Sequence, residues 1–307
     1  MKKRPKRDNQ VEKGADRGAS DVQGSTRGDG PGVLFVVATP IGNLDDITFR
    51  AVEVLKKVDF IACEDTRRSR ILLEKFQIAA ERISLHRFTE RKKADEIIQR
   101  IVRGESCALI CDAGAPAVSD PGALLVNEAH NAGIRVVPIP GPSSVMAALS
   151  ASGIDCATFV FRGFIPRKIT ERLAFFEDIR QDPRPAVMFE SPKRIAASLR
   201  TAHEILGPRP VVLARELTKV HEEILRGSAA QIAEELARRE SVQGEICMIV
   251  GPGFPQASEV DARQAVRELM EQGFTGKALA HEAQQRYGIK KSIAYKTFLE
   301  LNNDNER

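Results

Sequence analysis

Short apolar runs alternate with stretches of helical periodicity from Val33 onward, and this alternation limits the possible folds more than any other feature. The first runs, rich in β-branched residues, are LFVVAT, DFIACE, RISL, CALICD and IRVVPIP. Apolar spacing between and after them predicts helices over residues 46–58, 67–76, 90–103, 121–132 and 142–151. Such alternation predicts a mainly parallel sheet with helices on its faces. We expect Asp45 or Asp46 to cap the first helix.

A second alternating block follows the segment SGIDCAT, which we interpret as a linker. Its apolar runs are TFVFRGF, PAVMFES, PVVLARELT, EEILRG and GEICMIVG. Helices are predicted over residues 169–178, 193–206 and 228–239, but the two runs within residues 210–226 have no helix between them. Because parallel neighbours need a long crossover connection, this second sheet is expected to be mixed.

These patterns divide the chain into four segments. Residues 1–31 contain hardly any apolar side chains, so they cannot offset the entropy of ordering, and we expect a disordered basic tail. Residues 32–152 and 153–253 are predicted to form an N-terminal and a C-terminal α/β domain. After a stretch rich in Gly and Pro, helical periodicity predicts a small helical module over residues 258–307.

Composition excludes some classes of protein. No apolar run approaches the roughly 18 to 20 residues of a membrane helix, so we expect a cytoplasmic protein without a membrane partner. The net charge of +4 permits a nucleic-acid partner without requiring one. The five cysteines form no Cys-x-x-Cys pair, and the His-Glu pairs at His221 and His281 are not followed by the second histidine of a zinc helix. We therefore expect no metal.

The loops at the predicted strand ends lack the usual phosphate-binding motifs. Neither a Gly-x-Gly-x-x-Gly fingerprint nor a P-loop follows a predicted strand. Instead the loops ATPIGN, CDAGAPAVSDPG and PIPGPSS combine proline, which fixes φ, with glycine, which leaves the backbone accessible. Such loops suit a cationic cofactor with an apolar body better than a polyphosphate.

Taken in order, the motifs resemble the tetrapyrrole methylase family, and within it the branch of ribosomal RNA small subunit methyltransferase I. The motifs that carry the resemblance are TPIGNLDDIT, EDTR, DAGAPAVSDPG, PIPGPSS, ESPKR, ARELTKVHEE and GEICMIVG, which span about residues 33–251. The helical module resembles the helix-turn-helix-like extension of that branch. The resemblance implies two α/β domains with a cofactor cleft between them, and a homodimer.

The resemblance also implies a cofactor, a substrate and a set of contacts. The cofactor would be S-adenosylmethionine, and the substrate a cytidine ribose 2′-hydroxyl in 16S ribosomal RNA or the small ribosomal subunit. The expected cofactor contacts are Pro40, Asp112, Gly114, Ala115, Pro116, Val118, Ser143, Ser144, Met188 and Ala214. Ala115 departs from the threonine usual in that branch, which removes a side-chain hydroxyl and leaves the backbone contacts.

Methyl transfer to a ribose hydroxyl needs positioning, exclusion of water and a group that removes the proton. Candidates follow the second predicted strand: Glu64 and Asp65 as bases, with Arg67 near a phosphate or the developing oxyanion. Lys193 and Glu216 are rival candidates near strand ends of the second domain. A structural alternative is that the arginines of this segment form a solvated helix face paired with its own carboxylates.

Two other functions stay open from the sequence. One is a small-molecule methyltransferase of the same fold that acts on a tetrapyrrole. The other is a non-catalytic RNA-binding or ribosome-assembly factor. The basic tail, the lysines of the last helical segment and the arginines of CEDTRRSR suit phosphate contacts and favour the RNA methyltransferase.

Overall fold

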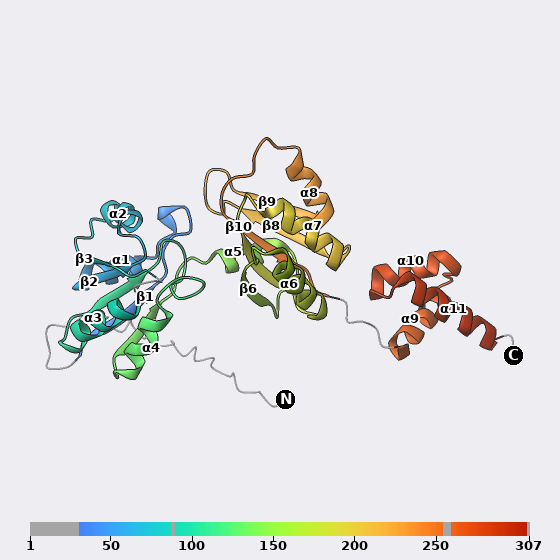
Figure 1. Ribbon diagram of the computed structural model, residues 1–307, viewed down its shortest axis with the longest axis horizontal. Coiled ribbons are helices and arrows are strands. Elements are labelled where there is room, and N and C mark those ends of the chain that lie inside the picture. The colour runs from blue at the N-terminus through green and yellow to red at the C-terminus, as the bar shows by residue number, and fades with distance from the viewer. Residues whose placement is uncertain (1–30, 87–89, 254–258, 306–307) are drawn as a thin grey trace, which may run out of the picture.

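The computed structural model describes residues 31–86, 90–253 and 259–305 of the chain. Within these residues the chain forms two five-stranded sheets with helices packed on them, and three further helices follow (Figure 1). The predicted pair of α/β units and the C-terminal helices are confirmed. The predicted disordered tail lies outside the described residues, apart from Pro31.

The first sheet is parallel, with strand order β3-β2-β4-β1-β5. Its strands are β1 (Val33–Val37), β2 (Phe60–Cys63), β3 (Glu81–Ser84), β4 (Cys107–Ile110) and β5 (Arg135–Ile139). The central strands β2 and β4 are buried along their whole length, as apolar strands are when helices cover both faces. The parallel pairing brings the loops after β1, β2 and β4 to one edge of the sheet.

Four helices cover the two faces of this sheet. They are α1 (Phe49–Lys57), α2 (Thr66–Lys75), α3 (Glu90–Val102) and α4 (Ala123–Asn131). Leu55 of α1 and Leu73 of α2 share one buried cluster with Val37 of β1. On the other face, Ile97 of α3 and Leu125 of α4 pack in the cluster of Leu34. The alternation of Leu34 and Val37 between faces follows from the two-residue period of a strand.

The first helix begins later than the sequence predicts. Asp45 and Asp46 lie in a short 3-10 turn, η1 (Leu44–Asp46), so the prediction that one of them caps α1 is wrong. The hydroxyl of Thr48 accepts a hydrogen bond from the amide of Ala51 at 3.1 Å and is the cap. Thr48 has the extended backbone and short side-chain acceptor that an N-cap requires.

The second sheet is mixed, as predicted. Its strands are β6 (Val160–Phe164), β7 (Ala186–Glu190), β8 (Pro210–Arg215), β9 (Glu223–Ser228) and β10 (Ile246–Val250). The order is β6-β7-β10-β8-β9, with β6 parallel to β7 and the other pairs antiparallel. The ends of β6, β7 and β8 therefore lie at the same edge as the start of β10.

Helices also cover both faces of the second sheet. On one face lie α6 (Ile169–Gln181), α7 (Ile195–Leu206) and α8 (Ala229–Ala237). On the other lies α5 (Ser144–Ser152), whose Ala148 and Leu149 pack with Val212 and Cys247 (Figure 1). Because α5 buries its apolar side chains on the second sheet, we propose that the domain boundary lies before α5 and not at residue 152.

The C-terminal helices form a unit with its own apolar core. They are α9 (Glu259–Glu271), α10 (Gly276–Tyr287) and α11 (Lys291–Asn305). Val266, Leu279 and Phe298, one from each helix, are buried in the same cluster. Gly288 ends α10 with φ of 67°, a conformation that favours glycine, and starts the turn into α11. None of the helices in the described ranges is long and apolar enough to cross a membrane.

Replacing Thr48 with alanine should destabilise α1 by about 0.5 to 2 kcal/mol, because the amide of Ala51 loses its acceptor. Hydrogen–deuterium exchange of the α1 amides measures the change. Asp46→Ala is the matched control, and as an exposed substitution away from the cap it should stay within about 0.5 kcal/mol of the original protein. Faster exchange in Asp46→Ala than in Thr48→Ala would contradict this assignment.

Candidate functional site

A pocket of about 430 Å³ lies where loops at the strand ends of the two sheets meet. From the first half of the chain it is lined by Ile41, Glu64, Arg68, residues 112–115, residues 118–120 and residues 143–145. From the second half it is lined by Phe164, residues 189–192, Ala214, Leu217 and residues 244–247. Both units therefore contribute to one site, at the edge where parallel α/β sheets usually bind ligands.

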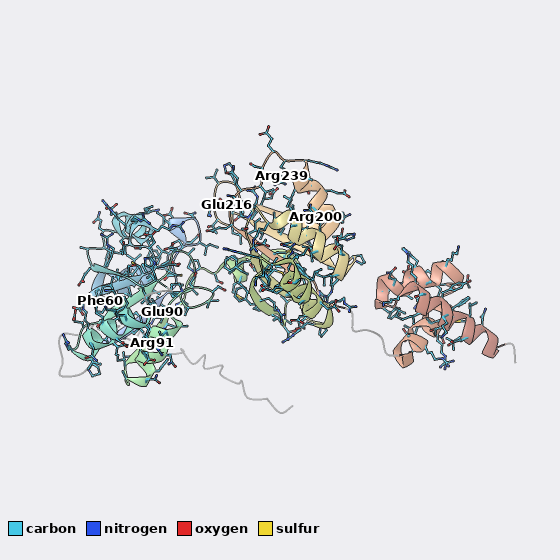
Figure 2. The ribbon with its side chains drawn as sticks, viewed as in Figure 1. Phe60, Glu90, Arg91, Arg200, Glu216 and Arg239 are labelled. Carbon is cyan, nitrogen blue, oxygen red and sulfur yellow. The ribbon has the colours of Figure 1, made fainter. Side chains whose placement is uncertain are left out.

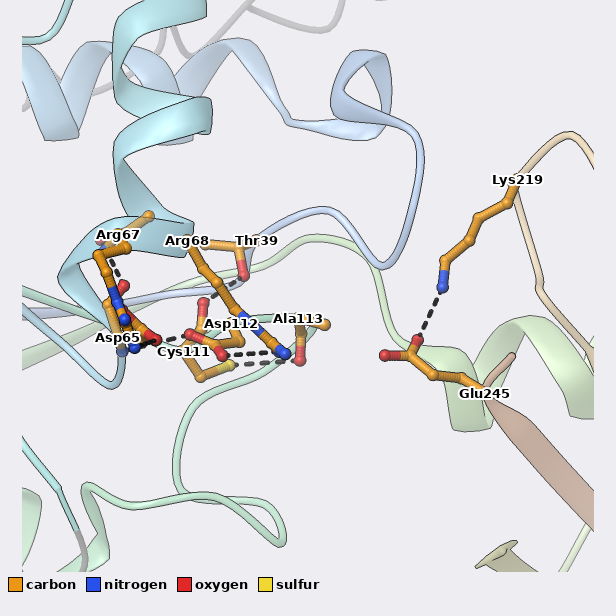
Figure 3. A network of polar contacts seen from close by, with 10 residues as sticks. Thr39, Asp65, Arg67, Arg68, Cys111, Asp112, Ala113, Lys219 and Glu245 are labelled. Atoms are coloured by element: carbon orange, nitrogen blue, oxygen red, sulfur yellow. Dashed lines mark hydrogen bonds and ion pairs between the residues drawn. The ribbon is translucent and has the colours of Figure 1, made fainter. Parts of the chain in front are cut away.

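Backbone pairing between Thr39 and Gly114 joins the loops after β1 and β4. The Thr39 amide donates to the Gly114 carbonyl at 2.9 Å, and the Gly114 amide donates to the Thr39 carbonyl at 3.0 Å. The Thr39 hydroxyl donates to the Cys111 carbonyl at 3.0 Å (Figure 3). Gly114 has φ of 81°, which other residues rarely adopt, so glycine permits this pairing.

The loop over residues 112–120 also holds two non-glycine residues in the left-handed region. Ala117 has φ of 67° and Ser119 has φ of 68°. Each such residue costs on the order of 1 kcal/mol or more and persists only where its surroundings fix it. Backbone strain of this kind is concentrated at ligand sites, and here it accompanies a loop that lines the pocket.

Asp112 is held by two donors from the segment after β2. Its carboxylate accepts from the Asp65 amide at 3.3 Å and from Arg68 Nη1 at 3.0 Å (Figure 3). The Asp112 side chain keeps 20% of its surface exposed, so it faces the pocket while both contacts fix its orientation. Arg68 remains 70% exposed at the pocket rim.

Carboxylates gather on this side of the pocket. Partial burial raises the pKa of Glu64, and the nearby negative charges of Asp112 and Asp120 raise it further. All three residues line the pocket. A carboxyl group with a raised pKa takes up a proton more readily than an ordinary glutamate, which suits a group that accepts one from a ligand.

Asp65 and Arg67 lie differently from Glu64, although they are its neighbours in sequence. Asp65 caps α2, with its carboxylate accepting from the Arg67 amide at 2.8 Å. Hydrogen bonds from the Arg67 side chain and amide lower the pKa of Asp65 to about 2. The Arg67 side chain is 90% exposed and pairs with Asp65 at 3.1 Å (Figure 3). Neither residue is among the described residues that line the pocket.

The second sheet contributes Glu190 at the end of β7. This glutamate is 2% exposed and forms an ion pair with Arg194. Its carboxylate also accepts from the Ser198 hydroxyl at 2.5 Å and from the Ser191 amide at 2.6 Å. With its acceptor capacity satisfied by the protein, Glu190 fixes the turn into α7.

The loop after β8 reaches across to the first domain. The Asn43 amide donates to the Thr218 hydroxyl at 3.0 Å, and a Cβ on Gly42 would lie 2.5 Å from Cγ of Lys219. Lys219 pairs with Glu216, which Figure 2 labels in the second domain, at 2.8 Å. It also pairs with Glu245 at 3.2 Å (Figure 3). The hydrogen bond from Lys219 lowers the pKa of Glu216, and that carboxylate also accepts from the Glu245 amide at 2.9 Å. Glu216 thus stabilises the conformation of the loop after β8.

The structure brings most of the predicted cofactor contacts together. Those that line the pocket are Asp112, Gly114, Ala115, Val118, Ser143, Ser144 and Ala214. Ser143 also caps α5, accepting from the Met146 amide at 3.4 Å. Among the described residues Pro40, Pro116 and Met188 do not line it, and Met188 is fully buried in the core of the second sheet. The rivals Lys193 and Glu216 also lie outside the lining.

Sequence reasoning did not single out several residues of the pocket. They are Arg68, Asp120, Phe164, Phe189, Glu190 and Leu217. Asp120 lies in the motif DAGAPAVSDPG and Glu190 in ESPKR, two of the motifs on which the family resemblance rests. Membership of these motifs was therefore the signal that could have indicated the two residues. Arg68 could not be separated from Arg67 or Arg70 by pattern, because which of these arginines reaches the pocket depends on how the helix is oriented on the sheet, and the sequence does not give that orientation.

The lining suits a ligand with an apolar body and a positive charge. Ile41, Val118 and Leu217 supply apolar surface, and Glu64, Asp112 and Asp120 add carboxylates from the first domain. A volume of about 430 Å³ lies within the range of roughly 300 to 1,000 Å³ typical of small-molecule sites. Ser143 and Ser144 at the start of α5 add polar groups that can orient the ligand.

Comparison with known proteins identifies, over most of the chain, the same family that the sequence motifs resemble. Residues 33–233 match the family described as Tetrapyrrole (Corrin/Porphyrin) Methylases. The ribosomal RNA small subunit methyltransferase I of Mesorhizobium japonicum is 44% identical over 270 residues, which cover 87% of this chain and 92% of the relative. The protein of the same name from Synechocystis sp. is 38% identical over 278 residues, covering 89% and 99%.

Solved structures share the fold at low sequence identity. A cobalt precorrin-4 methyltransferase aligns with a TM-score of 0.55 and 18% identity, covering 71% of this chain and 94% of its own. A diphthine synthase aligns with a TM-score of 0.57 and 16% identity, covering 72% and 90%. At these identities the similarity concerns the arrangement of the two sheets.

Asp112→Asn should lower the pKa of Glu64, because it removes a nearby negative charge and frees Arg68 from its partner. Carbon-13 NMR titration of the glutamate carboxyl groups measures the shift. Asp45→Asn, which alters an exposed carboxylate paired with Lys75, is the control and should leave the Glu64 titration unchanged. An upward shift in Asp112→Asn, or equal shifts in both variants, would refute the electrostatic coupling.

Proposed function

The chain belongs to the tetrapyrrole methylase family, and we propose that it methylates small-subunit ribosomal RNA at the ribose 2′-hydroxyl of a cytidine. The proposal of an RNA substrate rests on one observation. Over nearly the whole chain, the sequence matches relatives named for small-subunit ribosomal RNA methylation. The choice of a cytidine 2′-hydroxyl rests on the sequence motifs. The site described above supports a methyl transfer in which the protein positions both reactants.

Methyltransferases of this family use S-adenosylmethionine, and the pocket fits that cofactor. When bound, the cofactor supplies a reactive methyl group on a positively charged sulfonium. Asp112, the backbone of residues 113–115 and the hydroxyls of Ser143 and Ser144 would hold it. The acidic side of the pocket favours its positive charge, and the apolar lining excludes water from the transfer.

We assign removal of the ribose proton to Glu64. It lines the pocket and its pKa is raised by burial, whereas the pKa of Asp65 is lowered to about 2 and its carboxylate is engaged by Arg67. A better match of pKa to the working pH makes a more effective general base. Arg67 and Arg68, exposed on the first turn of α2, are placed to contact phosphate groups of the RNA.

Two alternative functions make different demands on the chain. A tetrapyrrole methyltransferase would use the same cofactor site but would bind a compact macrocycle, whereas the exposed arginines of α2 also suit the repeated phosphates of an RNA chain. A non-catalytic RNA-binding factor would keep the basic surface but not require the acidic pocket. Binding of S-adenosylmethionine to the purified protein separates the second alternative from the enzymes.

We extend the proposal to location and assembly. A protein that modifies the small ribosomal subunit is expected to work in the cytoplasm, where that subunit resides. A homodimer is proposed on the family resemblance. Sedimentation of the purified chain tests the dimer independently of its activity.

The direct test is mass mapping of 16S ribosomal RNA from a strain that lacks this gene. One cytidine 2′-O-methyl group should be absent, and purified protein with S-adenosylmethionine should restore it on isolated RNA or small subunits. Tetrapyrrole methylation without any change in ribosomal RNA would support the small-molecule alternative. Unchanged RNA and unchanged tetrapyrroles, with no cofactor binding, would support the non-catalytic one.

Glu64→Gln should reduce kcat by about 10²- to 10⁴-fold, the usual contribution of a general base. In the original protein kcat should rise with pH through the pKa of Glu64, because the ionised carboxylate is the active form, and the variant should lose that rise. Asp65→Asn keeps a capping side chain and is the matched control, with kcat within a few fold. A larger loss in Asp65→Asn than in Glu64→Gln would reverse our assignment.

A further inference from the structure

We propose that Phe164 is a stacking surface for the base of the nucleotide that receives the methyl group. This inference rests on the proposed RNA substrate and adds a binding site for the base at the rim of the pocket.

Phe164 is unusually exposed for an aromatic side chain that lines a pocket. It lies at the end of β6 and keeps 59% of its surface accessible, although it contributes to the pocket lining. Its ring contacts Phe189, with centroids 5.3 Å apart, and Phe189 in turn contacts Phe161 at 5.1 Å. The partly buried ring of Phe189 holds one side of Phe164 and leaves its accessible surface at the rim.

An irregularity in β6 directs this side chain. The register between β6 and β7 shifts between Phe161 and Phe164, and Gly163 between them has φ of 64°. An extra residue in a strand re-aims the side chains that follow it, and such irregularities occur next to active sites. A Cβ on Gly163 would lie 3.7 Å from the Ser119 hydroxyl, so the irregular segment faces the 112–120 loop of the first domain.

The turn that follows Phe164 is fixed by the end of β7. The Ile165 amide donates to the Phe189 carbonyl at 3.0 Å, and Arg194 Nη1 donates to the Ile165 carbonyl at 3.1 Å. Arg194 is itself paired with the buried Glu190. Because these contacts hold the backbone, Phe164 forms a preorganised surface, which reduces the entropy lost when a ligand stacks on it.

Two positively charged residues lie close in sequence to residues of this surface. Arg167 follows Phe164 by three residues, and Lys193 stands next to Pro192, which lines the pocket. Both side chains are exposed, and within the described part of the chain neither forms an ion pair with a carboxylate. An aromatic surface flanked by cations is the arrangement that single-stranded RNA requires, with the base on the ring and the phosphates on the charges.

The cofactor is the other candidate occupant of the Phe164 ring. Glu64, Asp112 and Asp120, which suit the positive charge of the cofactor, belong to the first domain. The lining carboxylates of the second domain are paired with cations, Glu190 with Arg194 and Glu245 with Lys219. Phe164 stands on that second domain, where Arg167 follows it by three residues and Lys193 follows the lining residue Pro192. Those cations complement RNA phosphates and would repel a sulfonium. We therefore assign the ring to the RNA base and make the cofactor an outcome of the test.

The test compares Phe164→Leu, Phe164→Ala and Phe164→Tyr, using small ribosomal subunits from the strain that lacks this gene. Loss of one stacked base should lower kcat/KM for the subunit by about 5- to 150-fold in the leucine and alanine variants, while tyrosine keeps most of it. Calorimetric titration should give Kd values for S-adenosylmethionine within twofold of the original protein for all three.

Phe49→Leu is the matched control, because Phe49 is 93% exposed and is not among the described residues that line the pocket. Equal loss in Phe49→Leu and Phe164→Leu, unchanged kcat/KM in Phe164→Leu, or a tenfold weaker cofactor Kd in Phe164→Leu would each overturn the proposal. If the original protein methylates no ribosomal RNA, the proposed function is wrong. In that case the titration with S-adenosylmethionine still shows whether Phe164 belongs to the cofactor site.

The flanking charges are tested by salt dependence. Arg167→Gln and Lys193→Gln should each weaken subunit binding and reduce the slope of log K against log salt concentration by about one unit or less per removed phosphate contact. Lys56→Gln is the control, since Lys56 is exposed in the last turn of α1, away from the strand ends that line the pocket. Equal slopes in all these variants would show that the two cations do not contact the RNA.

Discussion

The pairing of Thr39 with Gly114 is the contact on which the site depends. Parallel strands deliver their loops to one edge of a sheet, but a loop rich in Gly and Pro has no regular structure of its own to hold it there. Two backbone hydrogen bonds of 2.9 and 3.0 Å fix the loop after β4 to the exit of β1. Asp112 then lies within reach of Arg68, and Ser119, one of the two strained residues of the loop, faces Gly163 of the second domain.

Neighbouring carboxylates acquire different properties because their backbones point them to different surroundings. Glu64 is directed toward Asp112 and Asp120, so burial and like charge raise its pKa. Asp65 is the first residue before α2, where hydrogen bonds from Arg67 lower its pKa to about 2. The start of α2 therefore gives two adjacent carboxylates different roles: Glu64 is a candidate base, and Asp65 is a helix cap. For this reason the variants Glu64→Gln and Asp65→Asn are informative as a pair.

Both sheets could be predicted from the sequence because apolar runs and their connections carry the necessary signal. The absence of a helix between β8 and β9 was enough to predict a mixed second sheet. The packing of α5 could not be predicted, since its apolar side chains fit either domain and only the assembled fold shows them against Cys247. Within the site, Asp112 was predicted from its motif, whereas Arg68 depends on the direction of a side chain, which periodicity does not give.

The fold constrains the methyl donor more strongly than the acceptor. Proteins named for a precorrin and for diphthine share this arrangement of two sheets at under 20% identity, so the sheets alone do not select a substrate. Selection must come from side chains that reach the rim of the pocket. In this chain Phe164 of one domain and Arg68 of the other line the pocket, and the exposed Arg167 and Lys193 follow lining residues of the second domain closely in sequence. An exposed aromatic ring on one domain and an exposed arginine on the other are the two kinds of group that bind the bases and phosphates of a single-stranded nucleic acid.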